Sequence, residues 1–370
     1  MVINLKSQSE LSGFYIVYEG STNLERPGIY GISHLCEHLV CKSIEHLMDD
    51  FDRDGISWNA YTDTNQIVFY FTGLESRLSK YRKKILNSLS SFPVTKEQFE
   101  LERKIVLSEY EDYFNDQAYA HSMNLNRKLF NDYDPIGLKT DLENLKFMDC
   151  LSYFELQFQH PSKIINVSKT YKMKDNEIEF SNIVISKNIS YGLHDVAFEI
   201  GNDFKDKTSL LMLGPITNGN HAEIDFINLM MSMGLTSPLY NEVREKRGLV
   251  YYISCYQTRF HNQGVVTIGT LTANRNVKEV IDTVEKVLNK PSLFLNKNRF
   301  DLIRDFFNVK REKEEILRYN NVGEYLTPDG WSIYSILDTI KLKDLKDVYH
   351  EYYDFSKFYI SNDKKEFPNV

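Results

Sequence analysis

The segment His34-Leu35-Cys36-Glu37-His38 decides how this chain is interpreted. Two histidines four positions apart project from the same face of a helix, and a glutamate three positions after the first lies beside them. Imidazole nitrogens are good ligands for a divalent ion such as zinc, and a neighbouring carboxylate can take a proton from water. The order H-x-x-E-H is the inversion of the H-E-x-x-H motif of zinc peptidases. The motif therefore predicts a peptide hydrolase with His34 and His38 as metal ligands and Glu37 as general base.

Five residues also fit a partly exposed helix that carries two solvated histidines, and on the motif alone that alternative stays open. A catalytic zinc ion has three protein ligands and an open fourth position, and the motif supplies only two of them. A carboxylate or a histidine on a second rigid element must supply the third.

The best source of the third ligand is a predicted helix that begins at Thr95, where Thr95 and Gln98 have the spacing of a capping box. The residues of one helical face are Phe99, Glu102, Ile105, Val106 and Glu109. Glu102 and Glu109 thus fall two turns apart on an otherwise apolar face, where a carboxylate is costly unless it is paired or binds a metal. A ridge of surface charge that includes Glu111 is the alternative.

Three stretches of the first half carry a family resemblance: Gly28 with Gly31–His38, Asn59-Ala60-Tyr61-Thr62, and Glu102–Glu109. They resemble the M16 peptidases, the group of pitrilysin, insulin-degrading enzyme and mitochondrial processing peptidase. The resemblance implies one Zn²⁺ per chain, held by His34, His38 and Glu109. It implies that Glu102 is a supporting acid that orients a ligand and does not itself bind the metal. The strand with Asn59 and Ala60 would bind an extended peptide by adding it to a sheet edge.

The second half carries its own match, in the segment Gly234–Tyr251. It is similar to the second-domain signature of the M16 family, in which an arginine and a tyrosine seven residues apart reach the substrate. By that resemblance Arg244 donates to the substrate carbonyl and Tyr251 to the developing oxyanion. Without it, surface charge and core packing around a helix end at Gly248 explain both residues.

The chain of 370 residues is long enough for two domains with sizeable cores. The segments 145–168 and 342–361 both read as a helix, a short turn with Ser-Lys and a strand, which indicates two copies of one domain. Strands are predicted at 14–19, 66–72, 209–213 and 265–270, and helices at 95–127 and 277–288.

Strands followed by long helices predict an α+β fold of two homologous α/β-sandwich domains, each a mostly antiparallel sheet with helices on one face. The first domain, residues 1–169, would hold zinc. A polar linker at 170–188 would join it to a metal-free second domain, residues 189–370, that carries the Arg/Tyr motif.

The net charge of −8 argues against nucleic acid as a partner, because no basic surplus is available to neutralise phosphates. No apolar run approaches the length of a membrane span. Four unpatterned cysteines and a start without a signal or transit pattern favour the cytoplasm or another reducing compartment.

The predicted function is therefore a zinc-dependent endopeptidase that acts on extended or unfolded peptides. Since single-chain relatives need four such domains for a closed chamber, the family resemblance implies a homodimer, or a heterodimer with a related subunit. Two other hypotheses stay open: an inactive M16-like structural or chaperone-type subunit, and a metal-binding regulatory module.

Overall fold

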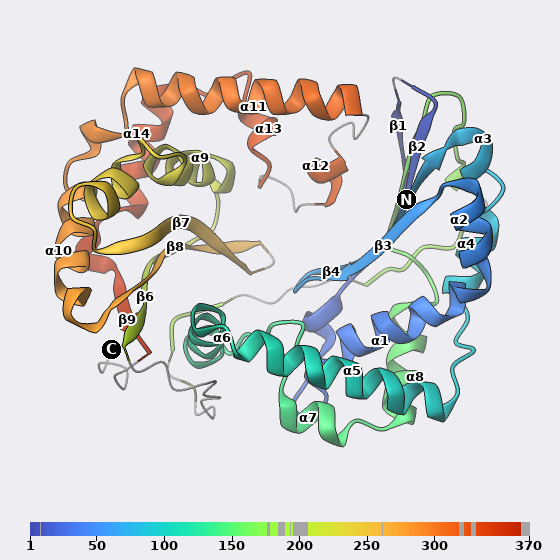
Figure 1. The fold of residues 1–370 in the computed structure, drawn as a ribbon. Helices are drawn as coiled ribbons and strands as arrows, with labels where there is room; N and C mark the ends of the chain where they lie inside the picture. The colour runs from blue at the N-terminus through green and yellow to red at the C-terminus, as the bar shows by residue number, and fades with distance from the viewer. Residues whose placement is uncertain are drawn as a thin grey trace. The chain divides into compact units, whose positions relative to one another are not determined.

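A computed structural model describes residues 1–7, 9–175, 178–183, 189–192, 194, 206–260, 262–317, 322–326 and 331–363. The chain forms two compact units, each assembled from three separate segments (Figure 1). Unit 1 contains Met1–Asp112, Asp132–Lys187 and Glu312–Leu326, and unit 2 contains Tyr113–Asn131, Asn188–Arg311 and Thr327–Val370. The predicted domains are contiguous, whereas each unit takes one short segment from the other half of the chain. Within the predicted linker, residues 176–177 and 184–188 lie outside the described ranges.

Unit 1 is built on a five-stranded sheet, sheet 1, with the order β1-β5-β2-β4-β3. The strands are β1 (Val2–Lys6), β2 (Leu11–Glu19), β3 (Ser57–Thr62), β4 (Gln66–Leu74) and β5 (Lys163–Ser168). Only β1 and β5 pair in parallel, and the other pairings of this sheet are antiparallel. Both β2 and β4 are nearly continuous buried runs, which is the pattern of strands covered on both faces.

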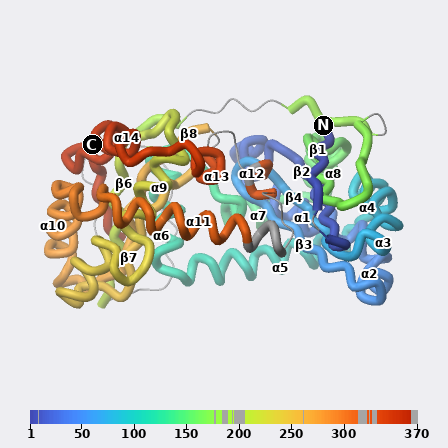
Figure 2. Tube along the Cα trace, turned by 90° about the horizontal axis from the view of Figure 1, so that it is seen from above, coloured from blue at the N-terminus to red at the C-terminus, as the bar shows by residue number. Residues whose placement is uncertain are grey.

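Helices cover one face of this sheet, and a short helix from the far end of the chain contacts the other. The helices of unit 1 are α1 (Ile32–Cys41), α2 (Met48–Asp54), α3 (Glu75–Leu78), α4 (Arg82–Leu89), α5 (Lys96–Phe114), α7 (Lys139–Asn144), α8 (Phe147–Gln157) and α12 (Val322–Leu326). Val322 of α12 is buried against Tyr15, Val17 and Val68. Figure 2 shows α12 on the other side of β2 and β4 from α3 and α4. The larger helices of unit 1 thus lie on one face, as predicted, and α12 is a helix on the other face that the prediction did not include.

Unit 2 repeats this plan with a four-stranded antiparallel sheet of order β7-β8-β6-β9. Its strands are β6 (Lys207–Thr217), β7 (Val250–Phe260), β8 (Gln263–Ala273) and β9 (Tyr359–Asn362). Its helices are α6 (Gln117–Phe130), α9 (His221–Ser232), α10 (Val277–Leu288), α11 (Lys297–Leu317), α13 (Ile333–Ile336) and α14 (Leu342–Tyr352). The fold class predicted from the sequence, α+β with mostly antiparallel sheets, is confirmed.

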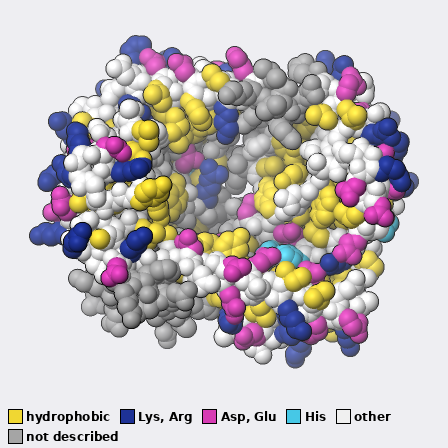
Figure 3. Space-filling view, viewed as in Figure 1, with side chains coloured by type: hydrophobic (Ala, Val, Ile, Leu, Met, Phe, Trp, Pro, Cys, Tyr) yellow, Lys and Arg dark blue, Asp and Glu magenta, His cyan; other side chains and the backbone are white. Residues whose placement is uncertain are grey.

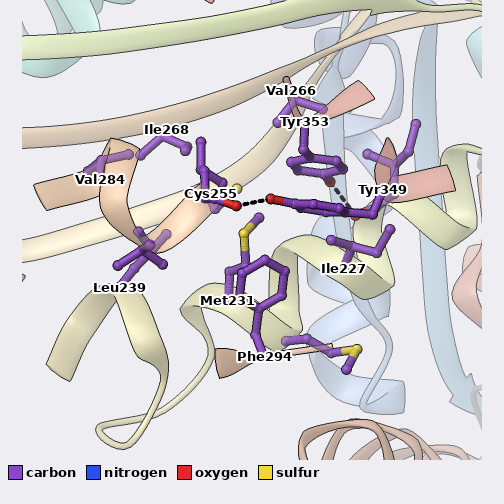
Figure 4. Packing of buried hydrophobic residues seen from close by; sticks show 14 of the residues in the cluster. Ile227, Met231, Leu239, Cys255, Val266, Ile268, Val284, Phe294, Tyr349 and Tyr353 are labelled. Carbon is purple, nitrogen blue, oxygen red and sulfur yellow. Dashed lines mark hydrogen bonds between the residues drawn. The ribbon is translucent and has the colours of Figure 1, made fainter. Parts of the chain in front are cut away.

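Alternate residues of β6 face two different cores. Leu210 and Met212 point into the main core, which helices α9, α10 and α14 complete with side chains such as Ile227, Val284 and Tyr349 (Figure 4). Leu211 and Leu213 point the other way, where they pack against three residues of α6: Leu125, Leu129 and Phe130. This alternation follows from the two-residue period of a strand, and it places α6 over the face of the four-stranded sheet that is opposite the main core.

The long helix predicted over 95–127 is two helices, and this part of the prediction is wrong. Helix α5 ends at Phe114, and α6 begins after Asp116, whose backbone is extended and whose side chain accepts a hydrogen bond from the Tyr119 N–H. Asp116 is thus an N-cap, a role that competes with helix continuation. The break falls where the chain passes from unit 1 to unit 2.

The predicted internal repeat is present. Helix α8 leads into β5, and α14 leads into β9. The caps also repeat, because Asp149 accepts a hydrogen bond from the Lys146 N–H at 2.8 Å and Asp344 accepts one from the Lys341 N–H at 3.1 Å. Within the described ranges, no helix is long and apolar enough to cross a lipid bilayer.

Acid should destabilise unit 2 through His121 of α6. Its ring nitrogens lie 3.0 Å from the hydroxyls of Ser209 and Ser361, and burial lowers its pKa from 6.5 to about 4. Between pH 6.5 and 4 the unfolded chain therefore binds a proton that the folded chain does not, so stability is complete above pH 6.5 and falls as the pH drops. Relative to His121→Gln, the wild-type free energy of unfolding should fall by about 3 kcal/mol over this window.

Urea unfolding at several pH values measures this difference. The exposed His350 on α14 provides the matched substitution outside the buried face of α6, as His350→Gln. A constant difference between wild type and His121→Gln across the window would show that His121 does not stay neutral in the fold.

Candidate metal centre

The helix that carries the H-x-x-E-H motif is fixed at its start. Gly31 precedes α1 in the left-handed region, with φ 95°, and a Cβ at this position would lie 2.9 Å from the Leu142 side chain. The carboxylate of Glu25 accepts hydrogen bonds from the Gly31 N–H at 3.0 Å and from the Ser33 N–H at 2.9 Å. These bonds satisfy free donors of the first turn. They also oppose the effect of burial, which raises the pKa of Glu25 to about 7. Glu25 therefore sets the position of the turn that bears His34.

Helix α5 presents two carboxylates to α1. The predicted capping box is confirmed, because Thr95 and Gln98 exchange side-chain to backbone hydrogen bonds of 2.9 and 3.2 Å. Glu102 is buried, whereas the Glu109 side chain is 39% exposed. Ile105 does not share the buried face, because 40% of it is exposed to solvent.

Three predicted ligands converge. The Nε2 atoms of His34 and His38 lie 3.2 Å apart, and the Glu109 oxygens lie 3.6 Å from His34 Nε2 and 3.9 Å from His38 Nε2. One ligating atom from each residue thus falls within 4.8 Å of the others. Figure 3 shows histidine side chains, in cyan, at the surface beside acidic side chains in magenta.

The spacing and chemistry of these atoms suit zinc. Two ligands that bind zinc tetrahedrally at about 2.0–2.1 Å are roughly 3.3 Å apart, so the imidazole separation already fits and the carboxylate needs a small inward shift. Burial, assisted by the neighbouring His38, lowers the pKa of His34 to about 3 and keeps its ring neutral, as a metal ligand must be. If both rings carry their proton on Nδ1, two Nε2 lone pairs face one another across 3.2 Å, and a cation there would accept both.

Glu102 contacts His38 and is not one of the three converging residues. Its Oε2 atom is 3.2 Å from His38 Nδ1. Since an ionised carboxylate only accepts, this contact fixes the Nδ1–H tautomer and leaves the lone pair on Nε2 free. The other oxygen, Oε1, is 2.9 Å from the Nζ atom of Lys42.

Glu37 lies between the ligands and the edge of sheet 1. It is 7% exposed, and the Thr62 hydroxyl of β3 donates a 2.8 Å hydrogen bond to its Oε2. Burial raises the pKa of Glu37, although the Thr62 bond opposes the shift. A carboxylate with a raised pKa is a better proton acceptor at neutral pH than an exposed one.

Strand β3 is an edge of sheet 1 within the described chain. Asn59 is exposed there, and its side-chain oxygen accepts a hydrogen bond from the Ala60 N–H at 2.9 Å. An edge strand offers backbone groups to an added peptide strand. The placement of Asn59 and Ala60 thus agrees with a peptide-binding edge.

Arg244 and Tyr251 belong to unit 2 and form a local stack. Arg244 lies in the last turn of a π-helical segment, Tyr240–Glu245. Its guanidinium lies 4.6 Å from the Tyr240 ring centre and 5.1 Å from that of Tyr251. The Tyr251 side chain projects from β7 and is 79% exposed. Two aromatic faces therefore hold a cation at the surface of unit 2.

Sequence reasoning gave no role to Glu25, Lys42 or Thr62. Lys42 had a detectable signal, because it follows His38 by four residues and so continues the ligand face of α1. Thr62 lies in the quoted Asn59–Thr62 segment, but only the strand register turns its hydroxyl toward Glu37. Glu25 had no such signal, since its contact depends on the fold of the loop before α1.

Comparison with known families gives two matches along the chain. Residues 7–135 match the model described as Insulinase (Peptidase family M16), and residues 195–305 match the model described as Peptidase M16 inactive domain. The first match spans His34, His38 and Glu109, and the second spans Arg244 and Tyr251.

Curated relatives are similar over most of the chain. An uncharacterized zinc protease of Rickettsia bellii is 22% identical over 364 residues, covering 89% of this chain and 87% of the relative. The uncharacterized zinc protease YmxG of Bacillus subtilis is 26% identical over 290 residues, covering 71% of this chain and 69% of the relative.

A solved structure agrees in fold. The crystal structure of a protease from Helicobacter pylori superposes with a TM-score of 0.81 at 17% identity and covers 98% of this chain and 96% of its own. With both family models matched in the expected order, the chain belongs to the M16 peptidase family, in its short two-domain form.

Proposed function

We propose that this protein is a zinc-dependent endopeptidase that cleaves extended or unfolded peptides. The observation that carries the proposal is the convergence of His34, His38 and Glu109 within 4.8 Å, with Glu37 on the same helix as both histidines. A buried glutamate beside such a set is the arrangement that peptide hydrolysis by activated water requires.

In this mechanism zinc, when bound, supplies a Lewis acid that polarises the scissile carbonyl and acidifies water. Glu37 accepts the proton of the attacking water and passes it to the leaving amine. The Thr62 hydroxyl, 2.8 Å from Glu37 Oε2, holds one carboxylate oxygen so that the other stays free to accept that proton. Glu102 keeps the proton of His38 on Nδ1.

The substrate would bind as an added strand. The exposed edge of β3 around Asn59 and Ala60 pairs with backbone groups, so it accepts many sequences when the chain is extended. Folded proteins do not offer a free strand, and unfolded peptides are therefore the proposed substrates.

Arg244 and Tyr251 are proposed to complete the site from a second copy of the chain, or from a related subunit, as the family resemblance implies. The guanidinium would donate to the substrate carbonyl and the phenol to the developing oxyanion. Tyr251 is suited to such a contact, because 79% of it is exposed to solvent.

An inactive structural subunit is the alternative. The family model described as an inactive domain matches residues 195–305, whereas the candidate ligands lie at residues 34–109. A subunit without turnover has no need to keep two imidazoles, a third ligand and a buried base together. The endopeptidase is therefore the better supported proposal.

A chelator assay on an unstructured fluorogenic peptide tests the function. We expect cleavage by the purified chain, its loss to background with a zinc chelator, and its recovery on addition of one equivalent of Zn²⁺. Zinc binding without cleavage of any unstructured peptide would favour a regulatory module. Absence of both zinc binding and cleavage would favour the structural subunit.

A further inference from the structure

Lys42 makes a contact that the proposed mechanism does not use. It follows the last residue of α1 and begins a short 3₁₀ segment, Lys42–Leu47. Its Nζ atom lies 2.9 Å from Glu102 Oε1 and 2.7 Å from Glu45 Oε1. The two partners differ in setting, because the Glu102 side chain is 5% exposed and the Glu45 side chain is 52% exposed.

The Glu102 carboxylate is shared between two partners. Oε2 lies 3.2 Å from His38 Nδ1, and Oε1 lies 2.9 Å from Lys42 Nζ. A buried carboxylate is strongly disfavoured unless a charge or hydrogen bonds compensate it. The imidazole is neutral when it serves as a ligand, so the ammonium supplies the compensating charge for Glu102.

We propose that Lys42 is a positioning residue for the metal centre, which holds the Glu102 carboxylate in the orientation that lets His38 present Nε2 to zinc. This inference rests on the proposed function. The chain of contacts runs from Lys42 to Glu102 to His38 and is continuous within unit 1. Four-residue spacing places Lys42 one turn beyond His38, so one helical face carries both groups that hold the Glu102 carboxylate.

The alternative is a surface ion pair between Lys42 and Glu45, of the kind that contributes little. The two explanations predict different zinc affinities for a variant that lacks the Lys42 ammonium. Loss of an outer partner of a metal ligand typically weakens metal binding by about 10- to 100-fold, whereas loss of an exposed i,i+3 pair leaves it unchanged.

The test measures the zinc dissociation constant of the full-length chain by chelator competition. Lys42→Met and Lys42→Gln should each weaken zinc binding by about 10- to 100-fold. Lys42→Arg should restore it to within a few-fold, because a guanidinium also pairs with a carboxylate. Glu45→Gln is the matched control, since it removes only the exposed partner of Lys42 and should match the wild type.

A double-mutant cycle with Glu102→Gln shows whether the effect passes through Glu102. In that background Lys42→Met should have no further effect on zinc binding. An equal loss in both backgrounds, or a Lys42→Met affinity within twofold of the wild type, would overturn the inference. Zinc binding and cleavage by the wild type test the proposed function separately. Their outcome does not depend on how the Lys42 variants behave.

Discussion

Glu37→Gln is expected to abolish peptide cleavage and to leave zinc binding intact. Glutamine keeps the shape of the side chain and can still accept the hydrogen bond from Thr62, but it cannot take a proton from water. A positioned general base contributes about 10²- to 10⁴-fold to a rate, so kcat on an unstructured peptide should fall by that factor. Zinc content measured on the same sample should remain at one ion per chain.

Glu45→Gln provides the matched control for this substitution. Glu45 lies eight residues further along the chain, is exposed and pairs with Lys42, so the same chemical change there should leave kcat at the wild-type value. Turnover by Glu37→Gln at more than a tenth of the wild-type rate would remove Glu37 from the role of base.

Glu109→Gln should release zinc. Glu109 is the third ligand of the proposed set, with oxygens 3.6 and 3.9 Å from the two imidazole nitrogens. A neutral amide is a weak ligand for zinc, and two histidines alone do not make a closed site. Since outer partners are worth about 10- to 100-fold in affinity, loss of a direct ligand should exceed about 100-fold, as measured by chelator competition.

Glu111→Gln is the control on the same helix. Its side chain is 61% exposed and pairs with Lys139 at 2.8 Å, so zinc affinity should not change. If Glu109→Gln instead keeps wild-type affinity, the third ligand is another carboxylate of α5, and Glu102 becomes the first candidate.

The sequence predicted the features that depend on interactions between residues close together in one helix. The four-residue spacing of His34 and His38 places both rings on one face of any helix, and the capping box at Thr95 fixes where α5 begins. Burial of Glu102 also followed from helical spacing among apolar residues. The convergence of α1 and α5 was predicted from the family resemblance. Residue spacing within one helix does not indicate which other helix packs against it.

Other features depend on tertiary contacts, which the hydrophobic periodicity of the sequence does not indicate. The break between α5 and α6 depends on Asp116, whose capping role is decided by which sheet the following residues pack against. The pairing of Lys42 with Glu102 joins two helices across 60 positions of sequence. Helix α12 has five residues, too few for a hydrophobic period, and only its packing on sheet 1 gives it a role.

The exchange of segments between the two halves has a consequence for synthesis on the ribosome. Domains generally fold from the N-terminus as they emerge, but unit 1 includes Glu312–Leu326. Val17 and Val68 lack their contact with Val322 until that stretch has left the exit tunnel. Unit 1 is therefore begun first but completed only after most of unit 2 has been made, and a nascent chain that stalls after residue 188 exposes part of an apolar sheet face.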